Sequence, residues 1–371
     1  MNPLFLKKVD GVIGSVLARL WPRPTQPKGS PLSVSSLLLI RPGGIGDAVL
    51  LIPTIRSLKK HFPDCEVTVL AERRNGAAFA LCPDLCQVLL YDRPKQLLAA
   101  MRQRFDVVID TEQWHRLSVV VARLVRSDLK IGFATNERKR LFSSAVLYAH
   151  QDYEAASFMH LLEPLGIQAW EVQYPFLVVP ELVANQAEKE LGTLGGQPFV
   201  TFFPGASIPE RRWGTDKFQR LAIWLNQQGL PVVVVGGAQD REAGEGILAG
   251  CHGINLAGGT SLAETAAVLQ RSRLLVSGDS GILHLAVGLD VPTVSLFGPG
   301  IAAKWAPRGE KHIVLNKNLP CSPCTRFGYT PPCPEEARCL QEISVDEVAD
   351  AVATLLERTR CNVGEGPNHC K

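Results

Sequence analysis

The sequence of 371 residues lacks any uninterrupted apolar run of the roughly 18 to 20 residues that a helix needs to span a bilayer. It also lacks a strong charge of either sign. The 39 Lys and Arg residues and 36 Asp and Glu residues give a formal net charge of +3, too small to favour nucleic acid as a partner. Lys7, Lys8 and Asp10 interrupt the first apolar stretch and no small-residue cleavage site follows, so no secretory signal is indicated. We therefore expect a cytoplasmic globular protein.

A dinucleotide fingerprint is also missing. The first glycine-rich turn reads Gly43-Gly44-Ile45-Gly46, and the late one runs from Gly278 to Gly281. Neither has the G-x-G-x-x-G spacing that brings a backbone close to a pyrophosphate in dinucleotide enzymes. The sequence therefore argues against a dinucleotide-dependent oxidoreductase.

The length and the alternation of short apolar runs with helical patterns predict an α/β protein with two domains. Residues 1–34 are an amphipathic helix and a proline-rich linker, and residues 346–371 a closing amphipathic helix and tail. Between them we expect one domain over 35–180 and another over 181–345. The first helix is suited either to a membrane interface, with its Lys and Arg toward lipid phosphates, or to packing on its own domain.

The stretch from Leu274 to Gly300 reads as a buried strand, a glycine turn, a helix and a second strand. Asp279, Ser280 and Gly281 follow the first strand, where parallel sheets bind ligands and where a helix N-terminus attracts phosphate. His284 lies one helical turn beyond Ser280 and on the same face. The alternative is a simple N-cap followed by a structural histidine.

Other predicted strand ends carry polar or cationic residues that would converge on this region. Asp47 follows the first strand and its glycines, either as a reactive carboxylate or as an acid matched to the helix dipole. A run of Arg and Lys residues later in the first domain either faces solvent or binds an anionic substrate. The candidates in the second domain are Ala206, Ser207, Arg211, Gln239 and Thr260, and those in the first domain are Gly44, Gly46, Arg138, Lys139 and Arg140.

Four of the ten cysteines lie close together in a proline-rich loop. Their C-x₂-C-x₈-C-x₅-C spacing resembles a structural four-thiolate site for zinc or an iron–sulfur cluster. Two disulfides are the rival interpretation, which a cytosolic location disfavours, and free thiols are the third. The residues are Cys321, Cys324, Cys333 and Cys339.

Three motifs together resemble the ADP-heptose:lipopolysaccharide heptosyltransferases over about residues 36 to 358. They are Gly-Gly-Ile-Gly-Asp47 with Pro53, Gly205-Ala-Ser with Arg211-Arg-Trp213, and Asp279-Ser-Gly-Ile-Leu-His284 with Phe297-Gly-Pro. The resemblance implies the GT-B fold, two Rossmann-like domains facing across a cleft. It implies an ADP-sugar donor on the C-terminal domain and an anionic glycolipid acceptor on the N-terminal one, at the cytoplasmic face of the inner membrane.

The same resemblance implies an inverting transferase that needs no cofactor for catalysis, with Asp47 as general base. Asp279, Ser280, Gly281 and His284 would hold the donor's heptose and diphosphate. Any metal on the four cysteines would then be structural. No oligomeric state is indicated.

The chain departs from the family pattern at three places: Arg211 replaces a lysine, Gln239 stands near an acid of some members, and Gly300 replaces a threonine. A different nucleotide-sugar and a non-catalytic nucleotide-binding protein are therefore the alternatives.

Overall fold

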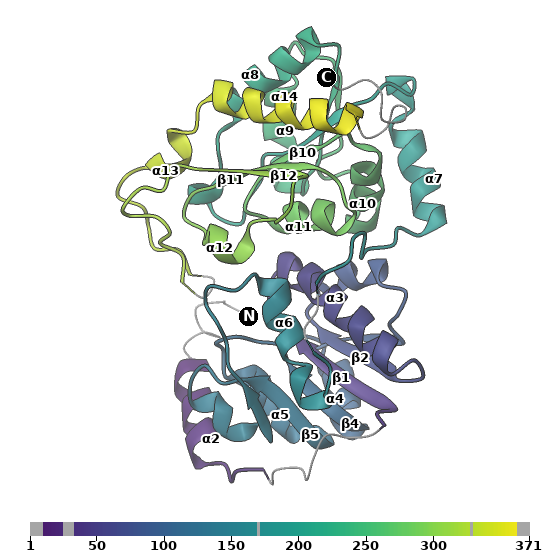
Figure 1. Ribbon diagram of the computed structural model, residues 1–371, viewed down its shortest axis with the longest axis vertical. Helices are drawn as coiled ribbons and strands as arrows, with labels where there is room; N and C mark the ends of the chain where they lie inside the picture. Colours follow the sequence, from purple (N-terminus) through teal and green to yellow (C-terminus); the bar gives the residue numbers. More distant parts are fainter. Residues whose placement is uncertain (1–9, 25–32, 169–170, 327–328, 362–371) are drawn as a thin grey trace. The chain divides into compact units, whose positions relative to one another are not determined.

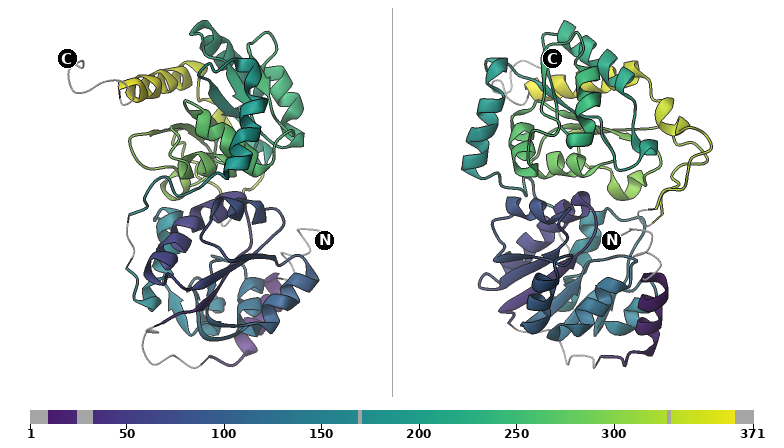
Figure 2. Two further views of the ribbon diagram at one scale, coloured as in Figure 1. Left: turned by 90° about the vertical axis from the view of Figure 1, so that its right-hand side faces the viewer. Right: turned by 180° about the vertical axis from the view of Figure 1, so that it is seen from behind.

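The computed structural model describes residues 10–24, 33–168, 171–326 and 329–361. The chain divides into two compact units, unit 1 from Met1 to Phe176 and unit 2 from Leu177 to Lys371. Each unit is a parallel sheet with helices on both faces (Figure 1, Figure 2). A search of the described residues finds no helix with the length and apolar character required to cross a membrane.

The sheet of unit 1 has six strands in the order β3-β2-β1-β4-β5-β6, all parallel. This order reverses direction between β1 and β4, so loops from these two strands diverge and leave room for a ligand at their carboxyl ends. The central strands are apolar and buried because helices cover both faces. The strands are β1 Ser36–Arg41, β2 Glu66–Ala71, β3 Gln87–Leu90, β4 Arg104–Asp110, β5 Arg126–Phe133 and β6 Ser144–Val146.

The longest helix of unit 1, α3, follows β1 and buries the middle of its length. The helices and helical turns of this unit are η1 Asp10–Gly14, α2 Ser15–Leu20, α3 Ile45–His61, η2 Gly76–Leu81, α4 Pro94–Arg102, α5 Leu117–Leu124, η3 Glu137–Leu141, α6 Glu154–His160 and η4 Glu163–Leu165.

The N-terminal segment packs on its own unit in the part that the structure describes. The Asp10 carboxylate accepts hydrogen bonds from the backbone N–H groups of Arg116 and Leu117, at the start of α5. Arg19 on α2 pairs with Glu137 on η3 at 2.9 Å. These contacts favour the packed alternative for residues 10–20, while the apolar residues before Asp10 lie outside the described part.

Unit 2 repeats the same topology. Its sheet has the order β12-β11-β10-β7-β8-β9, again parallel, with the reversal between β7 and β10. The sequence-based prediction of an α/β protein with two Rossmann-like sheets is confirmed. The strands are β7 Val200–Phe203, β8 Val232–Val234, β9 Gly253–Asn255, β10 Leu275–Gly278, β11 Thr293–Phe297 and β12 His312–Asn316.

The last helix, α14, joins the core of unit 2, where Val348, Val352 and Leu355 are buried with the inner residues of α8 and the sheet. Trp213 lies in the same core and donates its indole N–H to the Ile343 carbonyl at 2.9 Å. The helices and helical turns are α7 Glu181–Glu190, η5 Gly192–Leu194, η6 Pro209–Arg211, α8 Thr215–Gln227, η7 Ala238–Asp240, α9 Arg241–Ile247, α10 Leu262–Arg271, α11 Gly281–Gly288, α12 Ala302–Trp305, α13 Arg338–Gln341 and α14 Val345–Cys361.

Candidate active site

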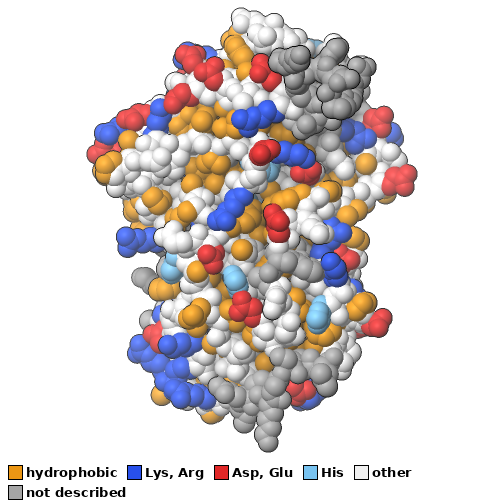
Figure 3. Space-filling view, viewed as in Figure 1, with side chains coloured by type: hydrophobic (Ala, Val, Ile, Leu, Met, Phe, Trp, Pro, Cys, Tyr) orange, Lys and Arg blue, Asp and Glu red, His pale blue; other side chains and the backbone are white. Residues whose placement is uncertain are grey.

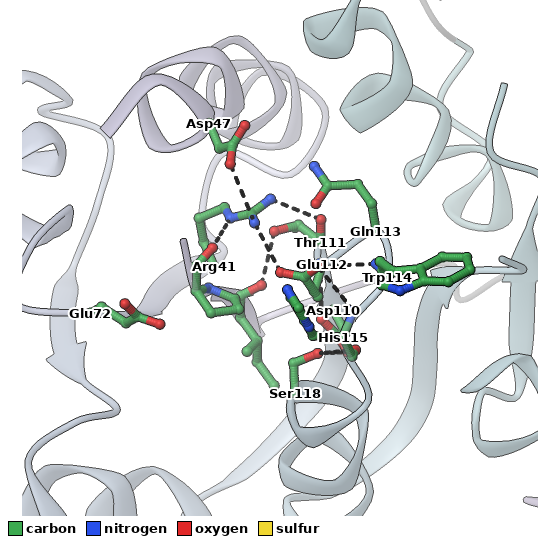
Figure 4. A network of polar contacts seen from close by, with 12 residues as sticks. Arg41, Asp47, Glu72, Asp110, Thr111, Glu112, Gln113, Trp114, His115 and Ser118 are labelled. Carbon is green, nitrogen blue, oxygen red and sulfur yellow. Dashed lines mark hydrogen bonds and ion pairs between the residues drawn. The ribbon is translucent and has the colours of Figure 1, made fainter. Parts of the chain in front are cut away.

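Polar side chains of unit 1 gather where the strand order reverses, at the carboxyl ends of β1 and β4 (Figure 4). Asp47 lies in the first turn of α3, directly after the turn that leaves β1. Gly43 in that turn has a φ of +111°, and an added Cβ would lie 3.1 Å from the Arg41 guanidinium. Because Gly43 has no side chain, the backbone can pass close to the Arg41 guanidinium and place Asp47 in the first turn of α3.

Gly44 and Gly46 of the same turn are backbone elements of the site. Gly44 is the N-cap residue of α3, and its carbonyl accepts a hydrogen bond from the Ala48 N–H at 3.3 Å. Gly46 follows in the first turn, beside Asp47. Their part in holding an acceptor stays a prediction.

The carboxylate of Asp47 lies 3.7 Å from the Arg41 guanidinium, and its side chain keeps 21% exposure. Burial raises the pKa of Asp47, while Arg41 lowers it and Glu112 raises it. A carboxylate with a raised pKa is a stronger base than an ordinary aspartate. Asp47 is therefore a partly exposed carboxylate of raised pKa, and its role as a base stays a prediction.

Arg138 was predicted to be a candidate for binding the acceptor, and its burial argues against that assignment. Its side chain is fully buried, and its guanidinium pairs with Asp110 at 2.5 Å and donates to the Glu112 carbonyl. Asp110 also accepts from the Ser118 hydroxyl at 2.9 Å. The positive charge of Arg138 compensates the negative charge of the Asp110 carboxylate inside unit 1, because a buried carboxylate without a counter-charge is unfavourable.

The other two residues of the basic run at 138–140 are less buried than Arg138. Lys139 is exposed and Arg140 is half-buried. Lys and Arg side chains gather over the region of α2 (Figure 3). The helical turn η3, which contains Lys139 and Arg140, packs against α2. Lys139 and Arg140 stay candidates for an anionic ligand.

In unit 2 the predicted strand, glycine turn and helix are present at β10 and α11. Ser280 is the N-cap residue and its hydroxyl accepts a hydrogen bond from the Leu283 N–H at 3.2 Å. Gly281 is the first helical residue, so the helix presents its N-terminal N–H groups beyond the end of β10. An oxyanion at this position would be stabilised by those N–H groups and by the helix dipole.

Arg211 and Asp279 form an ion pair beside this helix, with 3.2 Å between Nη1 and Oδ2. The end of η6 comes close to β10 because Gly278 has no side chain: a Cβ there would lie 3.0 Å from the Arg211 carbonyl oxygen. A Cβ at Gly300 would lie 2.3 Å from Asp279 Oδ2. The glycine that departs from the family pattern therefore makes room for this carboxylate.

The charge state of the pair is set by opposing effects. Burial raises the pKa of Asp279, and the Arg211 guanidinium opposes this. The Arg211 Nε is buried and has no hydrogen-bond partner, so the pair retains an unused donor. Such an orphaned N–H fits an anionic ligand.

His284 is 2% exposed and its ring lies 6.2 Å from the Trp305 ring. Burial lowers the pKa of His284 to about 4, so the imidazole is neutral at pH 7. Its Nδ1 atom is buried without a hydrogen-bond partner. A neutral ring with an unused polar atom is suited to a hydrogen bond with a ligand hydroxyl.

The other donor-side candidates are two residues in a loop and two residues that form hydrogen bonds with neighbouring side chains. Ala206 and Ser207 lie in the loop after β7, half-buried and exposed. The hydroxyl groups of Thr260 and Thr265 form a hydrogen bond with 2.9 Å between the oxygens. Gln239 donates to Asp240 at 3.1 Å.

Asp240 is a structural residue that the sequence analysis did not assign. It is buried and accepts a hydrogen bond from the Gly237 N–H at 2.9 Å. Its carboxylate fills the space left by Gly205 and Gly236, where an added Cβ would lie 2.5 Å and 2.8 Å from it. Asp240 thus holds the loops after β7 and β8 together.

The four-cysteine loop, residues 321–339, docks on the segment that follows β11. Backbone N–H groups of Cys324 and Thr325 donate to the Pro299 carbonyl at 3.1 and 2.9 Å. The Thr325 hydroxyl accepts from the Arg211 guanidinium at 3.4 Å. The loop thereby contacts the donor-side ion pair.

No disulfide joins its four cysteines in the structure, and whether they bind a metal stays a prediction. Burial raises the pKa of Cys339, and Cys333, Cys321 and Cys324 raise it further, so the thiols lie within electrostatic reach of one another. Over the described residues, no three Cys, His, Asp or Glu side chains meet as a metal-binding group.

Comparison with known proteins identifies the family. Residues 95–331 match the model for glycosyltransferase family 9 (heptosyltransferase). The chain belongs to this family. Lipopolysaccharide heptosyltransferase 2 of Escherichia coli K12 is 34% identical over 307 residues, which cover 75% of this chain and 87% of that protein.

Solved structures agree on the fold. The E. coli ADP-heptose lps heptosyltransferase II superposes with a TM-score of 0.72 at 23% identity, over 88% of this chain and 99% of that one. The E. coli heptosyltransferase WaaC with ADP-2-deoxy-2-fluoro heptose gives 0.68 at 17% identity, over 86% and 99%. This chain is therefore a glycosyltransferase with the GT-B fold.

Sequence reasoning missed the residues that surround Asp47. Arg41, Asp110 and Glu112 were not assigned to the site. Each of them directly ends β1 or β4 or follows one of these strands, the two that flank the reversal of strand order. A charged residue at both of these strand ends was the signal that could have identified them.

Proposed function

We propose that this glycosyltransferase transfers a heptose from ADP-heptose to a lipopolysaccharide core acceptor with inversion at the anomeric carbon. Membership of glycosyltransferase family 9 and the similarity to lipopolysaccharide heptosyltransferase 2 support the substrate class. The observation that carries the mechanism is Asp47, a partly exposed carboxylate of raised pKa beside the turn after β1.

The reaction needs one base and one stabilised leaving group. The acceptor hydroxyl oxygen attacks the anomeric carbon as the bond to the diphosphate breaks, the hydroxyl proton passes to Asp47, and ADP departs with the bonding electrons. A single displacement of this kind inverts the configuration. A general base contributes typically ~10² to 10⁴-fold to such a step.

The donor half of the proposal uses unit 2. Arg211 and the N-terminal N–H groups of α11 neutralise the charge that develops on the diphosphate, in the role a metal ion plays in other transferases. Asp279 and neutral His284 bind sugar hydroxyls. The unused Arg211 Nε and His284 Nδ1 support this assignment, because both are buried donors or acceptors that a ligand would satisfy.

The first test is Asp47→Asn. We expect kcat to fall by about 10² or more with little change in donor affinity, because the substitution removes a base and keeps the shape. Asp64→Asn is the matched control, since Asp64 is an exposed residue just past the other end of α3. Retention of more than about half of the wild-type turnover by Asp47→Asn would show that the base is another group.

The second test is donor affinity. Arg211→Ala, Asp279→Ala and His284→Ala should each weaken ADP-heptose binding by about 1 to 3 kcal/mol, through one lost polar or charged contact. Arg220→Ala, an exposed arginine on α8, is the control. Thermal protection by a panel of ADP- and UDP-sugars identifies the nucleotide. Protection by UDP-sugars alone would favour a different nucleotide-sugar.

We also propose that the protein works as a peripheral protein at a membrane face, since its acceptor is an anionic glycolipid. Lys139 and Arg140 provide charge for that contact. The four-cysteine loop would be structural in this scheme, whether its thiolates hold zinc, an iron–sulfur cluster or no metal, because no reaction step needs one.

A further inference from the structure

Arg41 is a buried guanidinium that contacts carboxylates on both sides. Its side chain is 1% exposed. It donates to the Pro42 carbonyl at 2.6 Å and to the Thr111 carbonyl at 3.0 Å, and its Nη2 atom lies 3.3 Å from Glu112 and 3.7 Å from Asp47. The backbone carbonyl contacts fix the plane of the guanidinium, so its position does not depend on either carboxylate.

Hydrogen bonds from the backbone also fix the position of the Glu112 carboxylate. Its Oε1 accepts hydrogen bonds from the backbone N–H groups of Trp114 and His115 at 3.0 and 3.2 Å, which leaves Oε2 for Arg41. Burial favours the neutral form of Glu112, but Arg41, His115 and Arg138 together lower its pKa. Glu112 is therefore a fixed negative charge on the side of Arg41 away from the solvent-reachable Asp47 (Figure 4).

We propose that Arg41 is a positioning residue that keeps Asp47 ionised and oriented at the start of α3. Glu112 offsets part of the Arg41 charge and so weakens its effect on Asp47. The inference rests on the proposed role of Asp47 as the base. Without Glu112 the full charge of Arg41 would act on Asp47 and make it a weaker base. Without Arg41 the partly buried carboxylate would bind a proton more readily, because burial disfavours its charged form.

The other groups around Asp47 have smaller or uncharged roles. Arg74, in the loop after β2, affects the pKa of Asp47 less than Arg41 and Glu112 do, and it is 64% exposed and bound to Glu72 at 2.6 Å. Tyr148, after β6, has its pKa raised by burial and by Glu154, so its phenol stays neutral. The Gly44 backbone also stabilises the carboxylate. The two strongest charges on Asp47 are thus Arg41 and Glu112.

The test is the pH dependence of kcat, with ADP release from ADP-heptose measured on heptose-deficient lipopolysaccharide. Activity requires ionised Asp47, so it rises with pH through the pKa of this residue. Arg41→Gln should move that acidic limb to higher pH by about 1 to 3 units, and Glu112→Gln should move it to lower pH. Arg41→Lys keeps the charge and should restore most of the wild-type profile, and Arg74→Gln is the matched control with little expected effect.

Opposite shifts in Arg41→Gln and Glu112→Gln, with kcat on the high-pH plateau within about tenfold of wild type, would support the proposal. Absence of a shift in Glu112→Gln, which keeps the side-chain shape, would overturn it even if Arg41→Gln fails to fold. The ¹³C carboxyl titration of Asp47, assigned by its loss in Asp47→Asn, gives the same shifts without any substrate. If Asp47→Asn keeps full activity, the base assignment fails instead, and the two failures are distinguishable.

Discussion

Removal of the Arg138 charge should destabilise unit 1 rather than weaken substrate binding. Both Arg138 and Asp110 are 0% exposed and lie 2.5 Å apart. Arg138→Met fills similar space but leaves Asp110 with only neutral hydrogen-bond donors, from Ser118 and the Glu112 backbone. Breaking a buried pair in this way costs about 3 to 5 kcal/mol.

The expected change is large enough to measure by thermal unfolding. For a unit of this size each kcal/mol lowers Tm by about 2 to 4 °C, so we expect a fall of roughly 6 to 20 °C. Lys139→Met is the control, because Lys139 is exposed and should change stability by less than about 0.5 kcal/mol. The double variant Arg138→Met with Asp110→Asn should recover part of the loss, since the unpaired charge is gone.

The pH dependence adds a second check. Burial already raises the pKa of Asp110 in the wild-type protein, against the pull of Arg138, and loss of Arg138 should raise it further. A carboxyl whose folded pKa lies above its unfolded value binds more protons in the folded state, so the penalty shrinks as the pH falls. An Arg138→Met protein with wild-type Tm and a raised acceptor KM would refute this reasoning and return Arg138 to the acceptor site.

Three further outcomes are expected. Neutralising Lys139 and Arg140 together should raise the KM for lipopolysaccharide and flatten its dependence on salt, and identical salt profiles would mean that these charges are only solvated. Thr325→Val should raise the donor KM two- to tenfold or so without lowering kcat, because it removes one hydrogen bond to Arg211, whereas Thr325→Ser should not. Chelation should leave kcat unchanged, and metal analysis with thiol counting should report the state of the four-cysteine loop. Loss of activity without loss of Tm would contradict a structural role.

Much of the fold was predictable because buried parallel strands leave continuous apolar runs. The strand Thr293–Phe297 was predicted with the bounds that the structure shows, between a proline and a glycine. The strand β5 was missed because Arg126, Asp128 and Lys130 interrupt its pattern. Lys130 is nevertheless buried, with its ammonium group donating to the Val125 and Ser127 carbonyls at 2.8 and 3.3 Å.

Three of the four edge strands of the two sheets were also missed. β6 and β9 are three residues long and only partly buried, so little apolar sequence marks them. β12 contains the apolar residues Ile313, Val314 and Leu315, which could have identified it. A strand with one neighbour needs less hydrophobic surface than a central strand with two.

The sequence by itself determined the fold class, the glycine turns and the reactive candidates at strand ends, because these follow from local spacing and from the rule that parallel strands present their carboxyl ends together. Only the tertiary structure decided which charges face solvent. Arg138 and Lys139 are adjacent in the chain, yet one is 0% exposed and the other is exposed. The difference comes from Asp110, a residue 28 positions away, whose buried carboxylate requires a cation. The placement of Arg41 between Asp47 and Glu112 likewise depends on β1 and β4 lying side by side, which no local pattern specifies.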